Sequence, residues 1–277
     1  MPDFSQAAFE SSIASSVIAL HCSLGSGQQW GRLAEELAGR HQLIAPDISG
    51  YGSNALAPER PITLAREVDL LSNHFAEASG PLHLVGHSYG GALAFKIATD
   101  SPMASRVRSL TLIEPVLPTV LLETGSDWQL HDHFVNVAHE VYEGLRNGSP
   151  EEALDTFLAF WQGAEPPGEL SSKARLRLMK YVEKLPFDFR SVFAEQNVAP
   201  AAAGIRVPTL LLSGGLSPRL TQRVVGCLAS MIPGAETRRL PEAGHMLAIS
   251  HAAAINPDIT RHIAQADALA RNAISGR

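Results

Sequence analysis

Ser88 lies in the stretch "LVGHSYGG", residues 84 to 91, where it forms the pattern G-x-S-x-G with Gly86 and Gly90. An apolar, strand-like run precedes this pattern and a helix-like run follows it, which is the context of a nucleophilic serine on a strained strand-to-helix turn. Glycines permit the close backbone approach that such a turn needs. The alternative is an ordinary glycine-rich turn that binds phosphate, but G-x-G-x-x-G fails because Ser88 replaces the second glycine. We therefore predict that Ser88 is a nucleophile.

A serine hydroxyl is a weak nucleophile and needs a base, and His245 in "PEAGHML" is the candidate. It follows the last expected strand and precedes the last helix, and Gly244 allows the sharp turn that would return the histidine over the sheet. The alternative is a histidine that only caps a helix or packs. The order of serine before histidine agrees with the G-x-S-x-G class of enzymes.

An oxyanion produced by attack of Ser88 needs N–H donors. We expect one from Tyr89, directly after the nucleophile, and one from Ser23 in the loop "LHCSLGSG", residues 20 to 27, where glycines give the backbone freedom. We interpret Cys22 in this loop as a small buried apolar residue rather than a second nucleophile.

Alternating strands and helices must position these residues. Short apolar runs predict strands at 16–20, 42–46, 82–86, 107–113, 209–212 and 236–240, and helical periodicity predicts helices between them. Such alternation is typical of the α/β class, with a mostly parallel, doubly wound sheet covered by helices on both faces.

The alternation stops between residues 116 and 203, where we find helical patterns only, at 128–146, 150–162, 172–185 and 187–196. We predict a core of residues 1–115 and 204–277 with a helical cap of 116–203. Ten of the 17 aromatic residues lie in the cap, which favours an apolar pocket for an acyl or aryl group. The alternative is that much of this set only packs the cap. The predicted substrate-binding residues are Trp128, Phe134, Phe160, Trp161 and Met246.

The motifs "LHCSLG", "GHSYGG" and "AGHM" together resemble the α/β-hydrolase superfamily, and the resemblance spans nearly the whole chain. It implies an esterase-like serine hydrolase with a helical cap inserted after the sixth strand of that fold. This chain departs from the pattern in three ways. Cys22 replaces a usual glycine, only about 16 residues precede the first strand, so the N-terminal strands are shortened or absent, and Ser217 stands where most members carry the acid.

Glu114 in "LTLIEPVLP" is the candidate for the missing acid. Pro115 ends the strand, so that Glu114 stands at its tip. The position resembles that of the acid in some haloalkane dehalogenases, although Ser88 excludes their aspartate-nucleophile chemistry. The alternative is a surface ion pair or helix cap. For Asp47 we expect loop hydrogen bonding, and Glu242 lies too near the strand to be preferred.

The 22 Lys and Arg against 28 Asp and Glu give a net charge of −6, which disfavours a nucleic-acid partner. No signal-peptide pattern and no apolar run of membrane length occur, so we expect a cytoplasmic protein without a membrane partner. Cys22 and Cys227 predict reduced thiols. His131 and His133 point apart on a helix, so we expect no metal and no cofactor. The expected partner is a small-molecule substrate, and either a monomer or a homodimer is compatible with the sequence.

These features predict hydrolysis of an ester-type bond through Ser88, His245 and Glu114 and an acyl-enzyme. A carbon–carbon bond hydrolase or a cofactor-free perhydrolase would use the same residues. A ligand receptor on a hydrolase scaffold is the non-catalytic alternative, because a fold does not fix a function.

Overall fold

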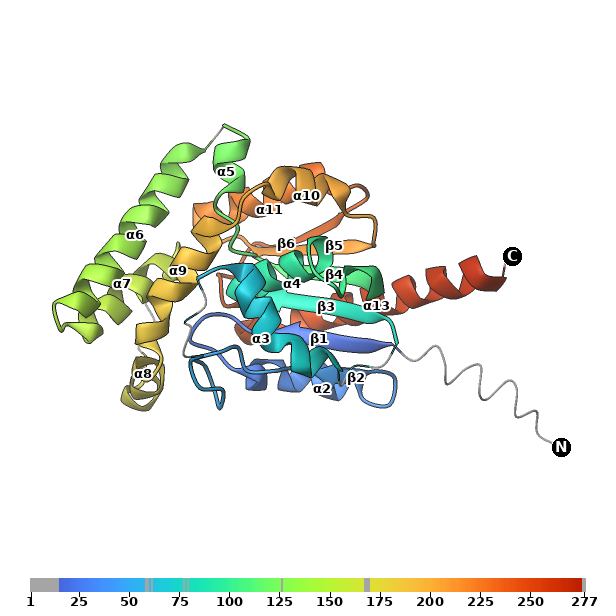
Figure 1. Ribbon diagram of the computed structural model, residues 1–277, viewed down its shortest axis with the longest axis horizontal. Coiled ribbons are helices and arrows are strands. Elements are labelled where there is room, and N and C mark those ends of the chain that lie inside the picture. Colours follow the sequence, from blue (N-terminus) through green and yellow to red (C-terminus); the bar gives the residue numbers. More distant parts are fainter. Residues whose placement is uncertain are drawn as a thin grey trace.

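The computed structural model describes residues 15–275, except 58–59, 61, 77, 79, 126 and 167–169. Its centre is a six-stranded sheet in which every neighbouring pair is parallel, in the order β2-β1-β3-β4-β5-β6 (Figure 1). The strands are β1 Ser16–Leu20, β2 Gln42–Ile44, β3 Leu82–His87, β4 Val107–Ile113, β5 Thr209–Gly214 and β6 Glu236–Leu240. The predicted α/β class and parallel sheet are therefore confirmed.

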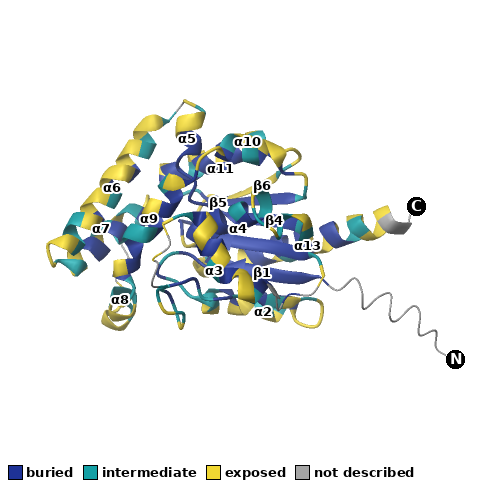
Figure 2. Cartoon of the chain, in the orientation of Figure 1, coloured by how far each residue is buried: buried dark blue, intermediate teal, exposed yellow. Residues whose placement is uncertain are grey.

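Helices cover both faces of the sheet. Neighbouring residues of a strand point to opposite faces, so each strand packs against both layers. Val17, Ala19 and Val85 pack against α2 (Gly31–Leu37) and α13 (Ala252–Ser275). Ile18 and Leu84 pack against the other layer, which consists of α3 (Leu64–Ala76), α4 (Tyr89–Thr99) and α11 (Arg219–Met231). Figure 2 shows the resulting buried sheet between partly exposed helices. Apolar side chains on both faces explain why these strands read as continuous hydrophobic runs.

The segment between β4 and β5 contains only helices among its described residues. They are α5 Val120–Glu123, α6 Trp128–Arg146, α7 Pro150–Gln162, α8 Ser172–Met179, α9 Leu185–Ala194 and α10 Val198–Gly204, with the 3-10 turn η3 Val182–Lys184 before α9. In Figure 1, α6 to α9 lie together on one side of the sheet, and α10 lies beside α11. Because α10 runs across residue 203 and packs against α4, α5 and α11, the expected cap boundary falls inside a helix.

Two predicted cap helices have different limits in the structure. The helix expected over 172–185 ends at Met179 and is followed by η3, and the helix expected over 187–196 is α9, Leu185–Ala194. Pro186 occupies the first turn of α9, where proline is tolerated. The last helix, α13, starts at Ala252 and contains Pro257 in its interior. None of the described helices combines the length and the apolar character needed to cross a membrane.

Candidate active site

Ser88 occupies a sharp turn between β3 and α4. Its backbone has φ 58° and ψ −118°, a conformation that costs energy for a residue with a side chain. A Cβ on Gly86 would lie 2.3 Å from the Gly90 carbonyl oxygen, and a Cβ on Gly90 would lie 2.3 Å from that of Leu20. Both glycines are thus required for steric reasons. The Ser88 N–H donates to the Ile113 carbonyl at 2.9 Å, which ties the turn to the end of β4.

Ser88, His245 and Glu114 form one chain of hydrogen bonds. Ser88 Oγ lies 2.9 Å from His245 Nε2, and His245 Nδ1 lies 2.6 Å from Glu114 Oε2. All three side chains are buried. An ionised carboxylate only accepts hydrogen bonds, so Nδ1 carries the proton and Nε2 presents its lone pair to the Ser88 hydroxyl. This tautomer suits proton transfer from the serine.

Glu114 follows β4 directly and adopts φ 45°. Its Oε1 accepts a hydrogen bond from the Gly214 N–H at 2.7 Å, at the end of the neighbouring strand β5. Burial alone would raise the pKa of Glu114, but interactions with His245, Ser217 and Gly214 bring it below its usual value. The structure therefore places an ionised carboxylate at the tip of β4. Ser217, at the usual acid position, is buried beside Glu114, where its hydroxyl helps to lower the pKa of that carboxyl group.

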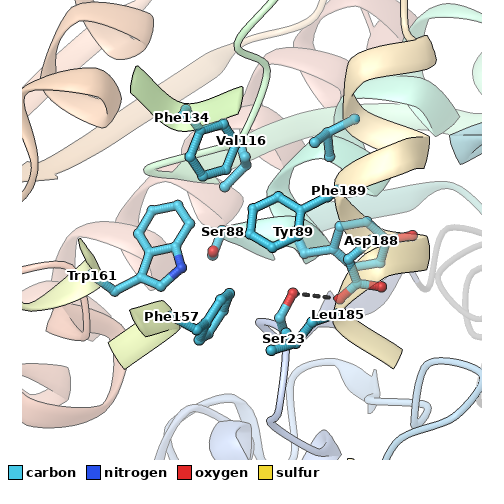
Figure 3. A pocket seen from close by; sticks show the side chains of 11 residues that line it. Ser23, Ser88, Tyr89, Val116, Phe134, Phe157, Trp161, Leu185, Asp188 and Phe189 are labelled. Atoms are coloured by element: carbon cyan, nitrogen blue, oxygen red, sulfur yellow. Dashed lines mark hydrogen bonds between the residues drawn. The ribbon is translucent and has the colours of Figure 1, made fainter. Parts of the chain in front are cut away.

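Ser23 and Tyr89, the predicted oxyanion donors, both lie on the wall of the cavity around Ser88 (Figure 3). Tyr89 is the first residue of α4, so its N–H has no acceptor within the helix. The loop that contains Ser23 is fastened by Asp47, which accepts hydrogen bonds from the N–H groups of Gly27 and Ser53, each at 2.7 Å. Asp47 thus has the loop contacts that we expected, and Glu242 is exposed.

The cavity has a volume of about 20 Å³, room for about one water molecule. Of the predicted substrate-binding residues, Phe134 and Trp161 line it. Phe160 packs behind Trp161, with ring centroids 4.9 Å apart. Trp128, the first residue of α6, and Met246 do not line the cavity, and they are 52% and 38% exposed to solvent. The complete wall consists of Ser23, Ser88, Tyr89, Val116, Phe134, Phe157, Trp161, Leu185, Asp188, Phe189 and Val192.

Sequence reasoning missed a buried ionic network next to the cavity. Lys184 Nζ lies 2.6 Å from Asp188 Oδ1 and 2.9 Å from Glu67 Oε2. The hydroxyls of Ser23 and Tyr51 donate to Asp188 Oδ2, both at 2.5 Å. Burial would lower the pKa of Lys184, but the two carboxylates raise it, so the lysine stays charged. The spacing of residues 184 and 188 is that of a helical ion pair, but nothing in the sequence indicates its burial.

One further polar cluster lies away from the cavity, near the amino-terminal ends of the central strands. Among the described residues, His41, His83 and Asp267 bring potential metal-ligand atoms within 4.8 Å of one another. Ser15 Oγ, however, lies within hydrogen-bonding distance of all three, and Arg108 Nη1 lies 2.7 Å from Asp267 Oδ1. These neighbours satisfy the cluster without a cation. His131 and His133 contact phenylalanine rings on the cap and do not belong to such a group.

Curated relatives resemble most of this chain at modest identity. The pimeloyl-[acyl-carrier protein] methyl ester esterase of Chromobacterium violaceum is 27% identical over 238 residues, 85% of this chain and 89% of the relative. The 2-hydroxymuconate semialdehyde hydrolase of Pseudomonas sp. (strain CF600) is 26% identical over 253 residues, 87% of this chain and 83% of the relative. A shorter match, to the probable protein phosphatase methylesterase 1 of Caenorhabditis elegans, is 32% identical but covers 35% of this chain and 28% of that relative.

The fold is also that of known structures. MenH from S. aureus superimposes with a TM-score of 0.70 over 91% of this chain and 95% of MenH, at 17% identity. The sequence model of the α/β hydrolase family matches residues 17–258, a range that begins in β1 and includes the Ser88 turn, the Glu114 strand end and the His245 loop. The parallel sheet, the serine turn between β3 and α4, and this match lead to one conclusion: the chain belongs to the α/β hydrolase family.

Proposed function

We propose that this hydrolase cleaves an ester-type bond of a small, apolar acyl or aryl substrate through Ser88, His245 and Glu114. The observation that carries the proposal is the hydrogen-bonded chain from Glu114 through His245 to Ser88, whose serine end opens into a cavity walled by aromatic side chains. The esterase among the relatives supports the reaction class.

In the proposed reaction, His245 Nε2 removes the Ser88 proton while Oγ attacks the ester carbonyl. The N–H groups of Ser23 and Tyr89 stabilise the oxyanion. Collapse of this intermediate breaks the bond to the alcohol, which takes the proton from His245. Water, deprotonated by the same histidine, then releases the acid and restores Ser88. Glu114 stabilises the imidazolium in both halves, and no cofactor is required.

Carbon–carbon bond hydrolysis is the second candidate. It is favoured by the relative named 2-hydroxymuconate semialdehyde hydrolase, which aligns over 87% of this chain. The same groups would serve, with a carbanion equivalent as leaving group in place of an alcohol.

Pre-steady-state hydrolysis of p-nitrophenyl butyrate tests the proposal. An acyl-enzyme predicts a rapid burst of p-nitrophenol, about equal to the enzyme concentration when deacylation is slow, and no burst from Ser88→Ala. Absence of turnover by a folded wild-type protein would contradict the esterase proposal and favour a receptor. Rapid cleavage of 2-hydroxymuconate semialdehyde, with weak ester hydrolysis, would favour the second candidate.

A further inference from the structure

Trp161 covers the proposed catalytic histidine. It is the penultimate residue of α7, and its indole ring stacks on the His245 imidazole with a centroid distance of 4.2 Å and an interplanar angle of 21°. The side chain is 8% exposed and forms part of the cavity wall (Figure 3). A group on the cavity side of this indole therefore lies close to His245 Nε2, the atom that transfers protons in the proposed reaction.

The turn after Trp161 fixes the ring to the catalytic loops. The Ala164 N–H donates to the Leu216 carbonyl at 2.7 Å, and the Gly244 N–H donates to Glu165 Oε1 at 3.1 Å. Gly163 has φ 59°, and a Cβ there would lie 2.5 Å from the Leu216 oxygen. The end of α7 is thus joined to the loop of His245 and to the loop after β5, so the indole is held in place.

The indole N–H of Trp161 is buried and has no hydrogen-bond partner among the described residues. The neighbouring rings of Phe134, Phe157 and Phe160 pack edge-to-face at 4.9 to 5.9 Å and offer no oxygen acceptor. A buried donor without an acceptor is destabilising unless a ligand or water satisfies it. Figure 3 shows the indole nitrogen on the side of the ring that faces Ser88 and Phe157, toward the cavity.

The other polar side chains on the wall already have partners: Ser88 lies within hydrogen-bonding distance of His245, and the Tyr89 hydroxyl lies 3.0 Å from Ser191 Oγ. Asp188 already accepts hydrogen bonds from Ser23, Tyr51 and Lys184. Apart from the proposed oxyanion donors, the N–H of Trp161 is therefore the donor, among the described residues of the cavity wall, that an incoming substrate can satisfy. Since the Trp161 ring stacks on His245, which gives its proton to the departing alcohol, the complementary acceptor belongs on the alcohol side of the ester.

We propose that the Trp161 N–H binds an acceptor oxygen in the alcohol part of the substrate, so that the site selects esters whose leaving group carries an ether or carbonyl oxygen near the scissile bond. This inference rests on the proposed ester hydrolysis. An apolar alcohol of the same size would leave the N–H without an acceptor. A site with a buried donor disfavours a substrate that leaves this donor unpaired.

Two esters of one acid test the selection. 2-Methoxyethyl butanoate and butyl butanoate have the same number of heavy atoms and give the same acyl-enzyme, and each kcat/KM is normalised to the rate of hydrolysis by hydroxide. We expect the wild type to prefer the ether by about tenfold, the effect of about one hydrogen bond. Trp161→Phe should reduce this preference to near one, even if both rates fall through lost packing.

Trp30→Phe is the matched control, because Trp30 is also buried and its indole N–H has no partner in the described part of the chain, but it packs on the opposite face of the sheet. It should keep the full preference. Equal normalised rates in the wild type, or an undiminished preference in Trp161→Phe, would overturn the inference while leaving ester hydrolysis intact. Failure of the wild type to hydrolyse either ester would instead overturn the proposed function and this inference with it.

Discussion

Glu114→Gln should make the protein a very poor esterase with an almost unchanged shape. The Gly214 N–H needs an acceptor and lies 2.7 Å from Glu114 Oε1, so the amide oxygen of glutamine will occupy that position. The amide NH₂ then faces His245 Nδ1, where Oε2 lies 2.6 Å away in the wild type. A donor at that place forces the proton of the imidazole to Nε2, which can no longer accept the proton of Ser88.

The magnitude follows from the tautomer and from the lost charge. An equivalent aspartate-to-asparagine change in a serine protease lowers kcat by about 10⁴, or about 5.5 kcal/mol of transition-state stabilisation. We expect a similar loss here, because the carboxylate is equally buried and its pKa is lowered by the histidine that it orients. Steady-state kcat for p-nitrophenyl butyrate measures the effect, and circular dichroism and thermal melting verify the fold.

Glu242→Gln is the matched control, since this carboxylate is exposed and lies three residues before His245. Its activity should stay within about twofold of the wild type, as for most surface substitutions. Less than a tenfold loss in Glu114→Gln would refute the assignment of the acid. Adding Ser217→Asp to Glu114→Gln should restore part of the rate, because Ser217 lies beside Glu114 and the next residue back, Leu216, is hydrogen-bonded to the His245 loop.

Three further predictions concern stability, measured by urea unfolding. Lys184→Met leaves two buried carboxylates without their cation and should lower the free energy of unfolding by about 3–5 kcal/mol. Lys180 is exposed, and Lys180→Met should lower it by less than about 0.5 kcal/mol. Equal losses would contradict the burial argument. Burial, and then the neighbouring His245, lower the pKa of His87 from 6.5 to about 3, so between these two pH values the unfolded chain binds a proton that the folded chain does not. Stability should therefore fall as the pH falls from 6 to 4, and His87→Gln should make this slope shallower by up to about 1.4 kcal/mol per pH unit, with an unchanged slope as the contrary result. Gly90→Ala should destabilise the protein by about 3 kcal/mol or more, because the added Cβ would meet a β1 carbonyl oxygen. A Cβ on Gly31 would meet no neighbouring atom within 4 Å, so Gly31→Ala should be neutral or stabilising. The reverse order would be inconsistent with the structure.

The sequence predicts best the elements in which local pattern and tertiary packing agree. The bounds of β4, α6 and α7 match the structure, because β4 is buried on both faces and α6 and α7 have clear amphipathic periodicity. The helix expected over 172–185 starts at the predicted residue but is shorter than predicted, because the helical pattern in the sequence continues through the turn Val182–Lys184. Helix α10, with the sequence "VAPAAAG", has too little periodicity to be found, yet it crosses the expected end of the cap.

Residues that belong to a sequence motif were easier to predict than residues whose role depends on tertiary packing. The G-x-S-x-G turn and the AGH loop identify Ser88 and His245, and the carboxylate before Pro115 identifies Glu114, each by position relative to a strand end. The rotation of the cap helices against the core decides which aromatic residues reach the cavity. The sequence does not contain this rotation, so it gave no reason to leave Trp128 out of the predicted cavity residues. The network of Lys184 is non-local in the same sense, since Glu67 lies 117 residues from Lys184 in the sequence.

The central claim is that Ser88 is acylated by substrate, and covalent labelling tests it most directly. A p-nitrophenyl alkylphosphonate is incubated with the intact chain, and the products are read by mass spectrometry of the protein and of its peptides. We expect one adduct per chain, located on Ser88, and none in Ser88→Ala. An adduct on another residue of the wild type, or equal labelling of a folded Ser88→Ala variant, would contradict the account.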